Sequence, residues 1–291
     1  MKLSNEKACI FIPDAIDTMT AIKRTTHLCI AAHQDDVEIM AYNAIAECYA
    51  DETKWFTAVV VTDGAGSPRN GEYAAMTDEE MQLVRRQEQN DAAAIGKYAA
   101  MLQLHYGSHI AKSSNDGKQE AKKSFLGNIL TTELAAIIRA AAPQILFTHN
   151  PADKHDTHVG VLMRVLEALR LLTPAERPQK IYAMEVWRGL DWLSDQAKLV
   201  FDTSPYPDIA EALLSIFASQ CAGGKRYDLA VLGRRLANAT FHTYNQVDAV
   251  SSSAYGLDIT ALIEDEDITH FIARHIDDLQ SDIQNRIQRV I

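Results

Sequence analysis

Short apolar runs alternate with longer helical patterns over the first two-thirds of the chain, and this alternation constrains the fold more than any other feature. Runs that are apolar at nearly every position are typical of parallel strands with both faces covered. They occur, with the weakest named last, at residues 28–32, 56–61, 145–148, 181–186 and 101–104. Helical patterns separate them, at residues 37–49, 78–97, 125–141 and 158–172. We therefore predict an α/β fold with a Rossmann-like, mostly parallel sheet and helices on both faces.

The strand signal fades after about residue 204, and the last third of the chain has mainly helical patterns. These lie at residues 207–219, 228–240 and 268–290. We expect a core over about 25–190 and a mainly helical C-terminal part over about 205–291. No repeat or low-complexity linker interrupts the 291 residues, so we expect a single domain, 1–291.

The last predicted helix has an apolar stripe with spacings of mostly three and four residues. The stripe consists of Phe271, Ile272, Ile276, Leu279, Ile283, Ile287 and Val290. An amphipathic helix buries such a stripe against another surface. We expect that surface to be the sheet of the same chain or a neighbouring subunit, and in the second case the protein is a homo-oligomer.

Composition disfavours several classes of protein. The chain has 39 acidic and 28 basic side chains, which gives a net charge of −11. This charge balance provides no basic surface that could bind a phosphate backbone, so we expect no nucleic-acid partner. No apolar stretch approaches the roughly 18 residues of a membrane span. Pro13, Asp14 and Asp17 interrupt the first apolar stretch, which is therefore no signal peptide. Four scattered cysteines without a C-x-x-C pair favour a reducing, cytoplasmic location.

Polar clusters follow two of the predicted strands, at the points where these strands end. The first is Ala32-His33-Gln34-Asp35-Asp36, and the second extends from His149 to His158. Histidine and aspartate are common in such loops as caps and turn formers. Ligands of open parallel sheets, however, bind beyond the carboxyl ends of the strands. The matching positions of the clusters therefore favour one shared site, whose imidazoles and carboxylates suit zinc or a similar divalent metal.

The spacing within the clusters suggests a division of roles. His33 and Asp36 are three residues apart at a strand-to-helix turn, so both can reach one centre, while Asp35 between them is free to act on water. His155 and His158 are also three apart, and one can bind the metal while the other faces the substrate. A catalytic zinc takes three protein ligands and keeps one position open. His33, Asp36 and His158 supply that number.

These motifs resemble those of the LmbE-like (PIG-L) family of zinc-dependent N-acetylglucosaminyl de-N-acetylases. In that family a strand ends in Ala/Pro-His-Pro-Asp-Asp, and a distal motif reads His-Pro-Asp-His. The counterparts here are Ala32-His33-Gln34-Asp35-Asp36 and His155-Asp156-Thr157-His158. A third, helical element, Arg-x-x-Glu with a later Gly, corresponds to Arg85-Arg86-Gln87-Glu88 and Gly96. The three motifs occur in the family's order, and the resemblance covers roughly residues 25 to 190.

The resemblance implies an LmbE-like fold and a metal-dependent hydrolase that removes the acetyl group from an N-acetylglucosamine-type sugar or conjugate with zinc-activated water. It implies that His33, Asp36 and His158 hold the zinc ion, or another divalent transition metal. The resemblance also implies that Asp35 is the general base and that His155 stabilises the oxyanion. Arg85 is expected to reach the sugar hydroxyls.

Two departures from the family pattern affect details of this site. Gln34 replaces a proline, which loosens the turn but removes no ligand. Asp156-Thr157 replaces Pro-Asp, so the carboxylate beside the histidine pair is displaced. Asp153 or Asp156 is expected to supply that contact.

The substrate contacts are less constrained by the sequence. We expect them from the loops 62–77, 105–124 and 188–206, with His149 and Asp63 as further candidates for lining the pocket. Trp187 and Trp192 are expected to form either an aromatic wall for a sugar or part of the core. Two alternatives to the deacetylase stay open. One is a metal-dependent hydrolase of another acyl amide, ester or lactone, and the other is a non-catalytic sugar- or metal-binding relative.

Overall fold

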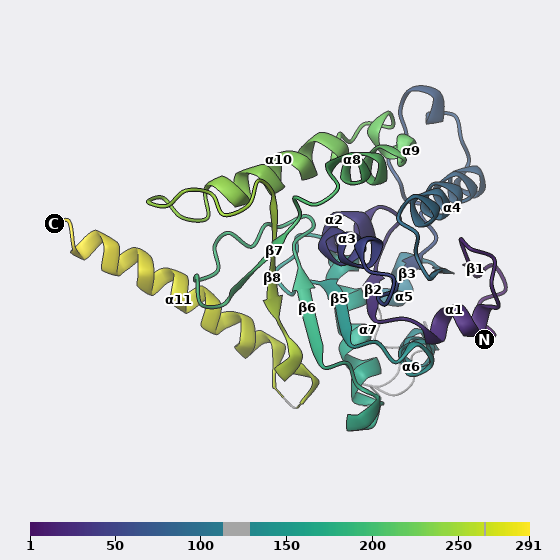
Figure 1. The fold of residues 1–291 in the computed structure, drawn as a ribbon, viewed down its shortest axis with the longest axis horizontal. Coiled ribbons are helices and arrows are strands. Elements are labelled where there is room, and N and C mark those ends of the chain that lie inside the picture. The colour runs from purple at the N-terminus through teal and green to yellow at the C-terminus, as the bar shows by residue number, and fades with distance from the viewer. Residues whose placement is uncertain (113–128, 265) are drawn as a thin grey trace.

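An eight-stranded mixed sheet forms the centre of the computed structural model, which describes residues 1–112, 129–264 and 266–291 (Figure 1). The strands in their order across the sheet are β1 (Cys9–Phe11), β4 (Ala100–Tyr106), β3 (Phe56–Thr62), β2 (His27–Ala31), β5 (Ile145–His149), β6 (Lys180–Met184), β8 (Ser253–Asp258) and β7 (Lys198–Asp202). The five central strands, β4 to β6, are parallel. β1 is antiparallel to β4, and β8 is antiparallel to both of its neighbours, β6 and β7.

The parallel strands coincide with the five apolar runs that predicted them. Successive residues of β2 alternate between two cores: Leu28 and Ile30 face one side of the sheet, and Cys29 and Ala31 face the other. All five residues of β2 are buried, which explains why the run has no polar alternation. The expectation of a mostly parallel sheet is only partly right, because the antiparallel strands β1, β7 and β8 extend it at both edges.

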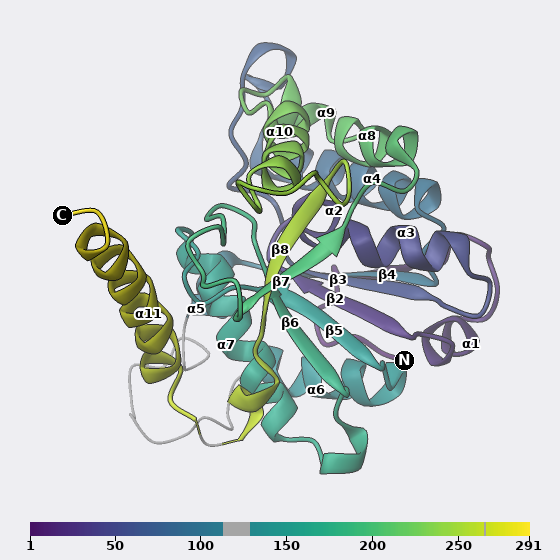
Figure 2. The same cartoon turned by 60° about the vertical axis from the view of Figure 1, so that its left-hand side comes forward.

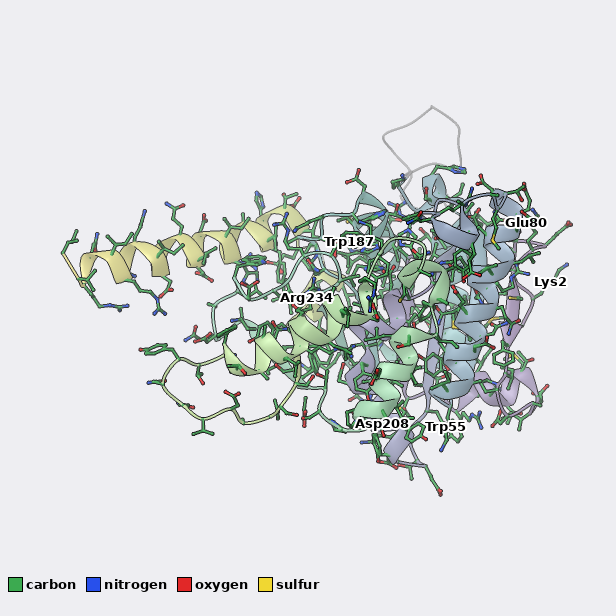
Figure 3. The ribbon with its side chains drawn as sticks, turned by 90° about the horizontal axis from the view of Figure 1, so that it is seen from above. Lys2, Trp55, Glu80, Trp187, Asp208 and Arg234 are labelled. Atoms are coloured by element: carbon green, nitrogen blue, oxygen red, sulfur yellow. The ribbon has the colours of Figure 1, made fainter. Side chains whose placement is uncertain are left out.

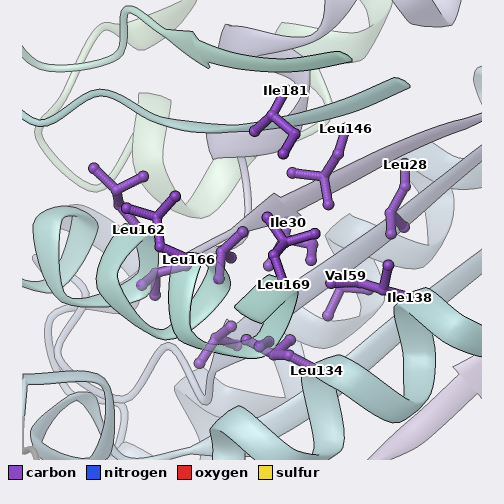
Figure 4. Packing of buried hydrophobic residues seen from close by; sticks show 14 of the residues in the cluster. Leu28, Ile30, Val59, Leu134, Ile138, Leu146, Leu162, Leu166, Leu169 and Ile181 are labelled. Atoms are coloured by element: carbon purple, nitrogen blue, oxygen red, sulfur yellow. The ribbon is translucent and has the colours of Figure 1, made fainter. Parts of the chain in front are cut away.

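One face of the sheet is covered by α1 (Thr18–Lys23), α5 (Ser108–Lys112), α6 (Ile129–Ala141) and α7 (Asp156–Arg170). The core on this face joins leucine and isoleucine side chains of α6 and α7 to Leu28, Leu146 and Ile181 of the strands (Figure 4). The 3-10 turns η2 (Pro174–Glu176) and η3 (Thr260–Ile263) lie beyond α7 and β8 in the chain. The helix predicted over 125–141 is described from Ile129 onward, and its predicted start at 125–128 lies outside the described residues.

The other face is covered by α2 (Asp36–Met40), α3 (Tyr42–Ala50), α4 (Asp78–Ile95), α8 (Pro207–Ser215) and α10 (Tyr227–Thr240), with the short α9 (Ala218–Cys221) between the last two (Figure 2). The single helix predicted over 37–49 is therefore two helices, divided at Ala41. α4 begins at a capping box formed by Thr77 and Glu80, shortly after the 3-10 turn η1 (Gly71–Tyr73).

The C-terminal third is less helical than its sequence predicts. It contains β8, which lies between β6 and β7 and carries Gly256 in its middle. A Cβ atom at Gly256 would come within 2.7 Å of the sulfur of Met184 and 2.8 Å of the Phe201 ring. The glycine that weakens the strand signal is therefore what allows β6, β7 and β8 to pack closely.

The last helix, α11 (Ile268–Gln288), packs on the body of the molecule only at its beginning. Phe271 is buried there, while Ile276, Ile283 and Ile287 are about half exposed on the part that projects away (Figures 1 and 2). Of the two surfaces expected for this stripe, the body of the same chain therefore covers only the first turns, and a neighbouring subunit stays a prediction for the rest. Across the ranges that the structure describes, no helix has the length and apolar character needed to cross a membrane.

Candidate active site

The predicted polar clusters meet at the carboxyl ends of β2 and β5, where the order of the parallel strands reverses. β3 and β4 lie on one side of β2, while β5 and β6 lie on the other. The loops leaving β2 and β5 therefore diverge to opposite faces and open a crevice between them, as is usual for ligand sites in such sheets. The first loop carries His33, Asp35 and Asp36, and the second carries Asp153, His155 and the start of α7.

Three potential metal ligands converge in this crevice. His33 Nδ1 lies 3.1 Å from both Asp36 Oδ2 and His158 Nε2, and His158 Nε2 lies 3.3 Å from Asp36 Oδ2. Asp36 and His158 are buried, whereas His33 is partly exposed. Burial opposes ionisation of Asp36, but His158 and His33 hold the pKa of its carboxyl well below the usual range. Two imidazoles and an ionised carboxylate directed at one point suit a divalent metal of the zinc type, so the residues fit the expected ion.

The ring of His158 is supported on its far side. Its Nδ1 lies 3.4 Å from Asp153 Oδ1, and the Asp153 side chain is fully buried. Burial opposes protonation of this ring, but Asp36 and Asp153 raise the pKa of His158 to about 10. Of the two carboxylates expected beside the histidine pair, Asp153 is thus the one in contact, and Asp156 is exposed at the first position of α7. A carboxylate at this place orients the ring and increases its basicity as a ligand.

His149 was a candidate for lining the pocket, but the structure places it elsewhere. It is completely buried, stacks on His158 with ring centroids 4.0 Å apart, and its Nε2 accepts the backbone N–H of Ala32. His149 does not line the cavity described below. It therefore helps to hold His158 and the end of β2 in place.

Asp35 lies next to the candidate metal ligands and at a strained point of the backbone. Its φ of 92° is in the left-handed region, which aspartate adopts at a cost. Its N–H donates to Gln89 Oε1 at 3.2 Å, a contact that helps to hold this conformation. Burial raises the pKa of Asp35 to about 6, with Arg85 opposing that shift and Asp36 adding to it. Asp35 lines the cavity and is suited to accept a proton near neutral pH.

Gln34 compensates for the missing proline of the same turn. Its side chain is buried, and Nε2 donates to the backbone oxygen of Thr62 at 3.1 Å. The turn is therefore tied to the end of β3 by a hydrogen bond.

His155 caps α7 and faces the same cavity. Its Nδ1 accepts the N–H of Thr157 at 3.2 Å, which places the proton of the neutral ring on Nε2. Burial, together with the nearby His33 and His158, lowers the pKa of His155. Its ring lies 4.9 Å from that of His33, so a neutral N–H donor is available beside the candidate metal ligands.

Arg85 reaches the site but is almost completely buried. It projects from α4, donates to the backbone oxygen of Gln34, and lies 3.2 Å from Asp35 Oδ2 and 3.5 Å from Glu88 Oε2. Glu88 in turn accepts two hydrogen bonds of 2.6 Å from Ser219 of α9. Arg85 thus lines the cavity while it also holds the carboxylate of Asp35.

A cavity of about 730 Å³ opens over these residues. Its walls come from the loops after β3 and β4, from Trp187 after β6, and from Gln220, Lys225, Tyr227 and Arg234 around α9 and α10. The loops 62–77 and 105–124 were expected here, although residues 113–124 lie outside the described part. The loop 188–206 does not line the cavity. The residues of α9 and α10 were missed, and the only signal for them is the run Gly223-Gly224-Lys225-Arg226-Tyr227, which combines flexible, basic and aromatic residues.

A comparison with protein families supports the resemblance that the motifs indicated. The model of the PIG-L family, described as GlcNAc-PI de-N-acetylase, matches residues 28–169. This range contains all three motifs and the predicted catalytic and metal-binding residues, together with Arg85. Residues 28–169 thus resemble a PIG-L domain. A search of curated proteins gave no match.

Solved structures share the fold of the chain at low sequence identity. N,N'-diacetylchitobiose deacetylase from Pyrococcus horikoshii is 15% identical, with a TM-score of 0.63, 82% of this chain covered and 85% of that one. GalB, the 4-carboxy-2-hydroxymuconate hydratase from Pseudomonas putida KT2440, is 19% identical, with a TM-score of 0.58 and coverages of 81% and 96%. The A40926 pseudoaglycone deacetylase Dbv21 is 16% identical, with a TM-score of 0.56 and coverages of 81% and 97%. Because deacetylases and a hydratase share this fold, the reaction must be argued from the site.

Proposed function

We propose that the chain is a metal-dependent de-N-acetylase that hydrolyses the acetamide of an N-acetylglucosamine-type sugar or conjugate. One observation carries the proposal: the ligand atoms of His33, Asp36 and His158 lie within 3.1–3.3 Å of one another, and His33 and Asp36 line the same cavity as the raised-pKa carboxyl of Asp35. The match to the PIG-L family model supports this reaction class. When bound, zinc or another divalent metal supplies a Lewis acid that makes water a nucleophile near neutral pH.

In this proposal Asp35 accepts the proton from the attacking water. A pKa of about 6 keeps the carboxylate ionised at neutral pH and still basic enough to take a proton. Arg85 contacts the same carboxylate and fixes its orientation. The proton then passes from Asp35 to the leaving amine, so acetate and a free amino sugar are produced.

His155 stabilises the oxyanion that develops on the acetyl carbonyl. Because its Nδ1 accepts the N–H of Thr157, its Nε2–H is the group that can donate a hydrogen bond to the oxyanion. The lowered pKa of His155 favours the neutral ring, so we assign it as a neutral hydrogen-bond donor and not as an imidazolium.

We also propose that the core and the C-terminal third form one functional domain. The cavity supports this view, because its walls include residues of β2 and β5 as well as residues of α9 and α10.

The test is acetate release from a panel of N-acetyl sugars and their conjugates, measured with and without added zinc. The proposal predicts release that requires metal and is lost in His158→Ala. Hydrolysis of esters, lactones or larger acyl amides without any acetate release would instead favour the alternative hydrolase. A metal-loaded protein that binds these sugars and turns over nothing would be a binding relative.

A further inference from the structure

Cations at the wall of the cavity lack a carboxylate partner among the described residues, in a chain whose net charge is −11. Lys225 and Arg234 both line the cavity, and among the described residues neither forms an ion pair. The next residue after Lys225 shows the contrast, since Arg226 points elsewhere and pairs with Asp228 at 2.7 Å. Among the residues that the structure describes, Lys225 and Arg234 thus have no carboxylate at ion-pair distance, and the buried Glu185 acts on Arg234 only at longer range.

Both cations gather around one exposed aromatic side chain. The ammonium of Lys225 lies 5.2 Å from the centroid of the Trp187 ring. Arg234 donates one N–H to the backbone oxygen of Val186, directly before Trp187, and guanidinium has further N–H groups to offer (Figure 3 labels Trp187 and Arg234). The ring of Tyr227 meets that of Trp187 edge-on at 6.0 Å. The tryptophan is 37% exposed, so part of its surface is open to a ligand.

The same tryptophan also lies next to the proposed reaction centre. The ring of His155 is 6.4 Å from that of Trp187. A path of short contacts thus leads from the oxyanion donor to the aromatic ring and then to the cations. A sugar whose acetamide reaches His155 can stack on Trp187, and a substituent of that sugar then reaches Lys225 and Arg234.

The acidic residues of the cavity have other roles. Asp35 and Asp36 belong to the reaction centre, and Asp63, at the end of β3, accepts the N–H of Ala65 within its own loop. The cationic part of the wall and the acidic part are therefore supplied by different elements.

We propose that the cavity binds an N-acyl amino sugar that carries an anionic substituent, a carboxylate or a phosphate, and that Lys225 and Arg234 bind this substituent beside Trp187. This inference rests on the proposed function for the position of the acetamide. It adds the charge of the substrate, which the metal site does not determine.

Three probes with one sugar test it: the methyl glycoside of N-acetylglucosamine, its carboxymethyl glycoside, and N-acetylglucosamine 1-phosphate. Binding to the metal-free protein is measured by calorimetry, and acetate release is measured with the zinc-loaded protein. We expect one or both anionic probes to bind roughly tenfold more tightly than the methyl glycoside, the scale of one charge-assisted hydrogen bond. The preference should shrink at high ionic strength.

Variants separate charge from shape. Lys225→Ala should remove most of the preference for the anionic probes over the methyl glycoside, while Lys225→Arg should keep the preference. Lys23→Ala, an exposed lysine of α1 outside the cavity, is the matched control. The inference is overturned if wild type binds all three probes equally, or if Lys225→Ala weakens all three to the same extent. Absence of acetate release would instead count against the proposed function, because the binding preference is measured without turnover.

Discussion

Asp153→Asn should weaken metal binding although Asp153 is not one of the proposed ligands. Its carboxylate lies 3.4 Å from His158 Nδ1 and also accepts the backbone N–H groups of His155, at 2.9 Å, and Trp187, at 3.1 Å. Asparagine keeps the shape but has one acceptor oxygen for three N–H groups, and it has no charge to support the ring. Loss of such a partner typically costs 10–100-fold in metal affinity, or about 1.4–2.7 kcal/mol.

Asp156→Asn is the matched control, because Asp156 is an exposed aspartate three residues further along the same segment. Zinc affinity is measured by competition with a chromophoric chelator for wild type and both variants, with circular dichroism to verify the fold. We expect the asparagine at 153 to weaken zinc and the one at 156 to leave it within twofold. Equal affinities for wild type and Asp153→Asn would refute the argument that Asp153 supports His158. A loss confined to the Asp156 variant would assign that support to the other carboxylate.

Three further predictions concern a buried acid, the arginine of the site and the projecting helix. Burial raises the pKa of Glu38 to about 8 from an unfolded value of 4.5, so its contribution to stability is complete below about pH 4.5 and is lost as the pH rises to about 8. Glu38→Gln should not show this loss, which is on the order of 5 kcal/mol. Urea titrations at pH 5.5 and 8.5 that give parallel changes for wild type and Glu38→Gln would contradict this prediction. Arg85→Met should move the acidic limb of the kcat/KM profile to higher pH with metal content unchanged, because Arg85 lowers the pKa of Asp35; a raised KM with an unmoved limb would restrict Arg85 to sugar binding. Ile283→Asp on the half-exposed stripe of α11 should reduce self-association in sedimentation experiments, whereas Gln284→Asp on the same turn should not; a wild type that is monomeric at all concentrations would show that the stripe has no second copy to bind.

The parallel core could be predicted from the sequence because strands that are buried on both faces have apolar side chains at nearly every position. β2 and β3 are buried at every position, so their runs contain no polar alternation. β8 is also buried at nearly every position but contains Ser253 and Gly256, which do not favour strands. Its place depends on contacts with β6 and β7, and a local pattern does not report such contacts.

The residues of the site likewise divide into those that the sequence predicts and those that it does not. His33, Asp36 and His158 follow predicted strands within short motifs, so topology alone brings them together. Lys225 and Arg234 belong to a helical region with no motif, and they reach the cavity only because α10 packs against β8 and α8. Whether Asp153 or Asp156 supports His158 depends on the path of the loop between β5 and α7. The sequence does not determine that path, so it left both aspartates as candidates.

The central claim assigns different work to the adjacent carboxylates Asp35 and Asp36, and paired asparagine variants test it most directly. Bound zinc and acetate release are measured for both variants after reconstitution. Asp35→Asn should keep zinc and lose roughly 10²–10⁴-fold in kcat, the usual contribution of a general base, without rescue by added zinc. Asp36→Asn should lose zinc affinity and recover part of its rate in excess zinc. Retention of metal and near-normal turnover by both variants would contradict the account, and loss of zinc by Asp35→Asn alone would reverse the two roles.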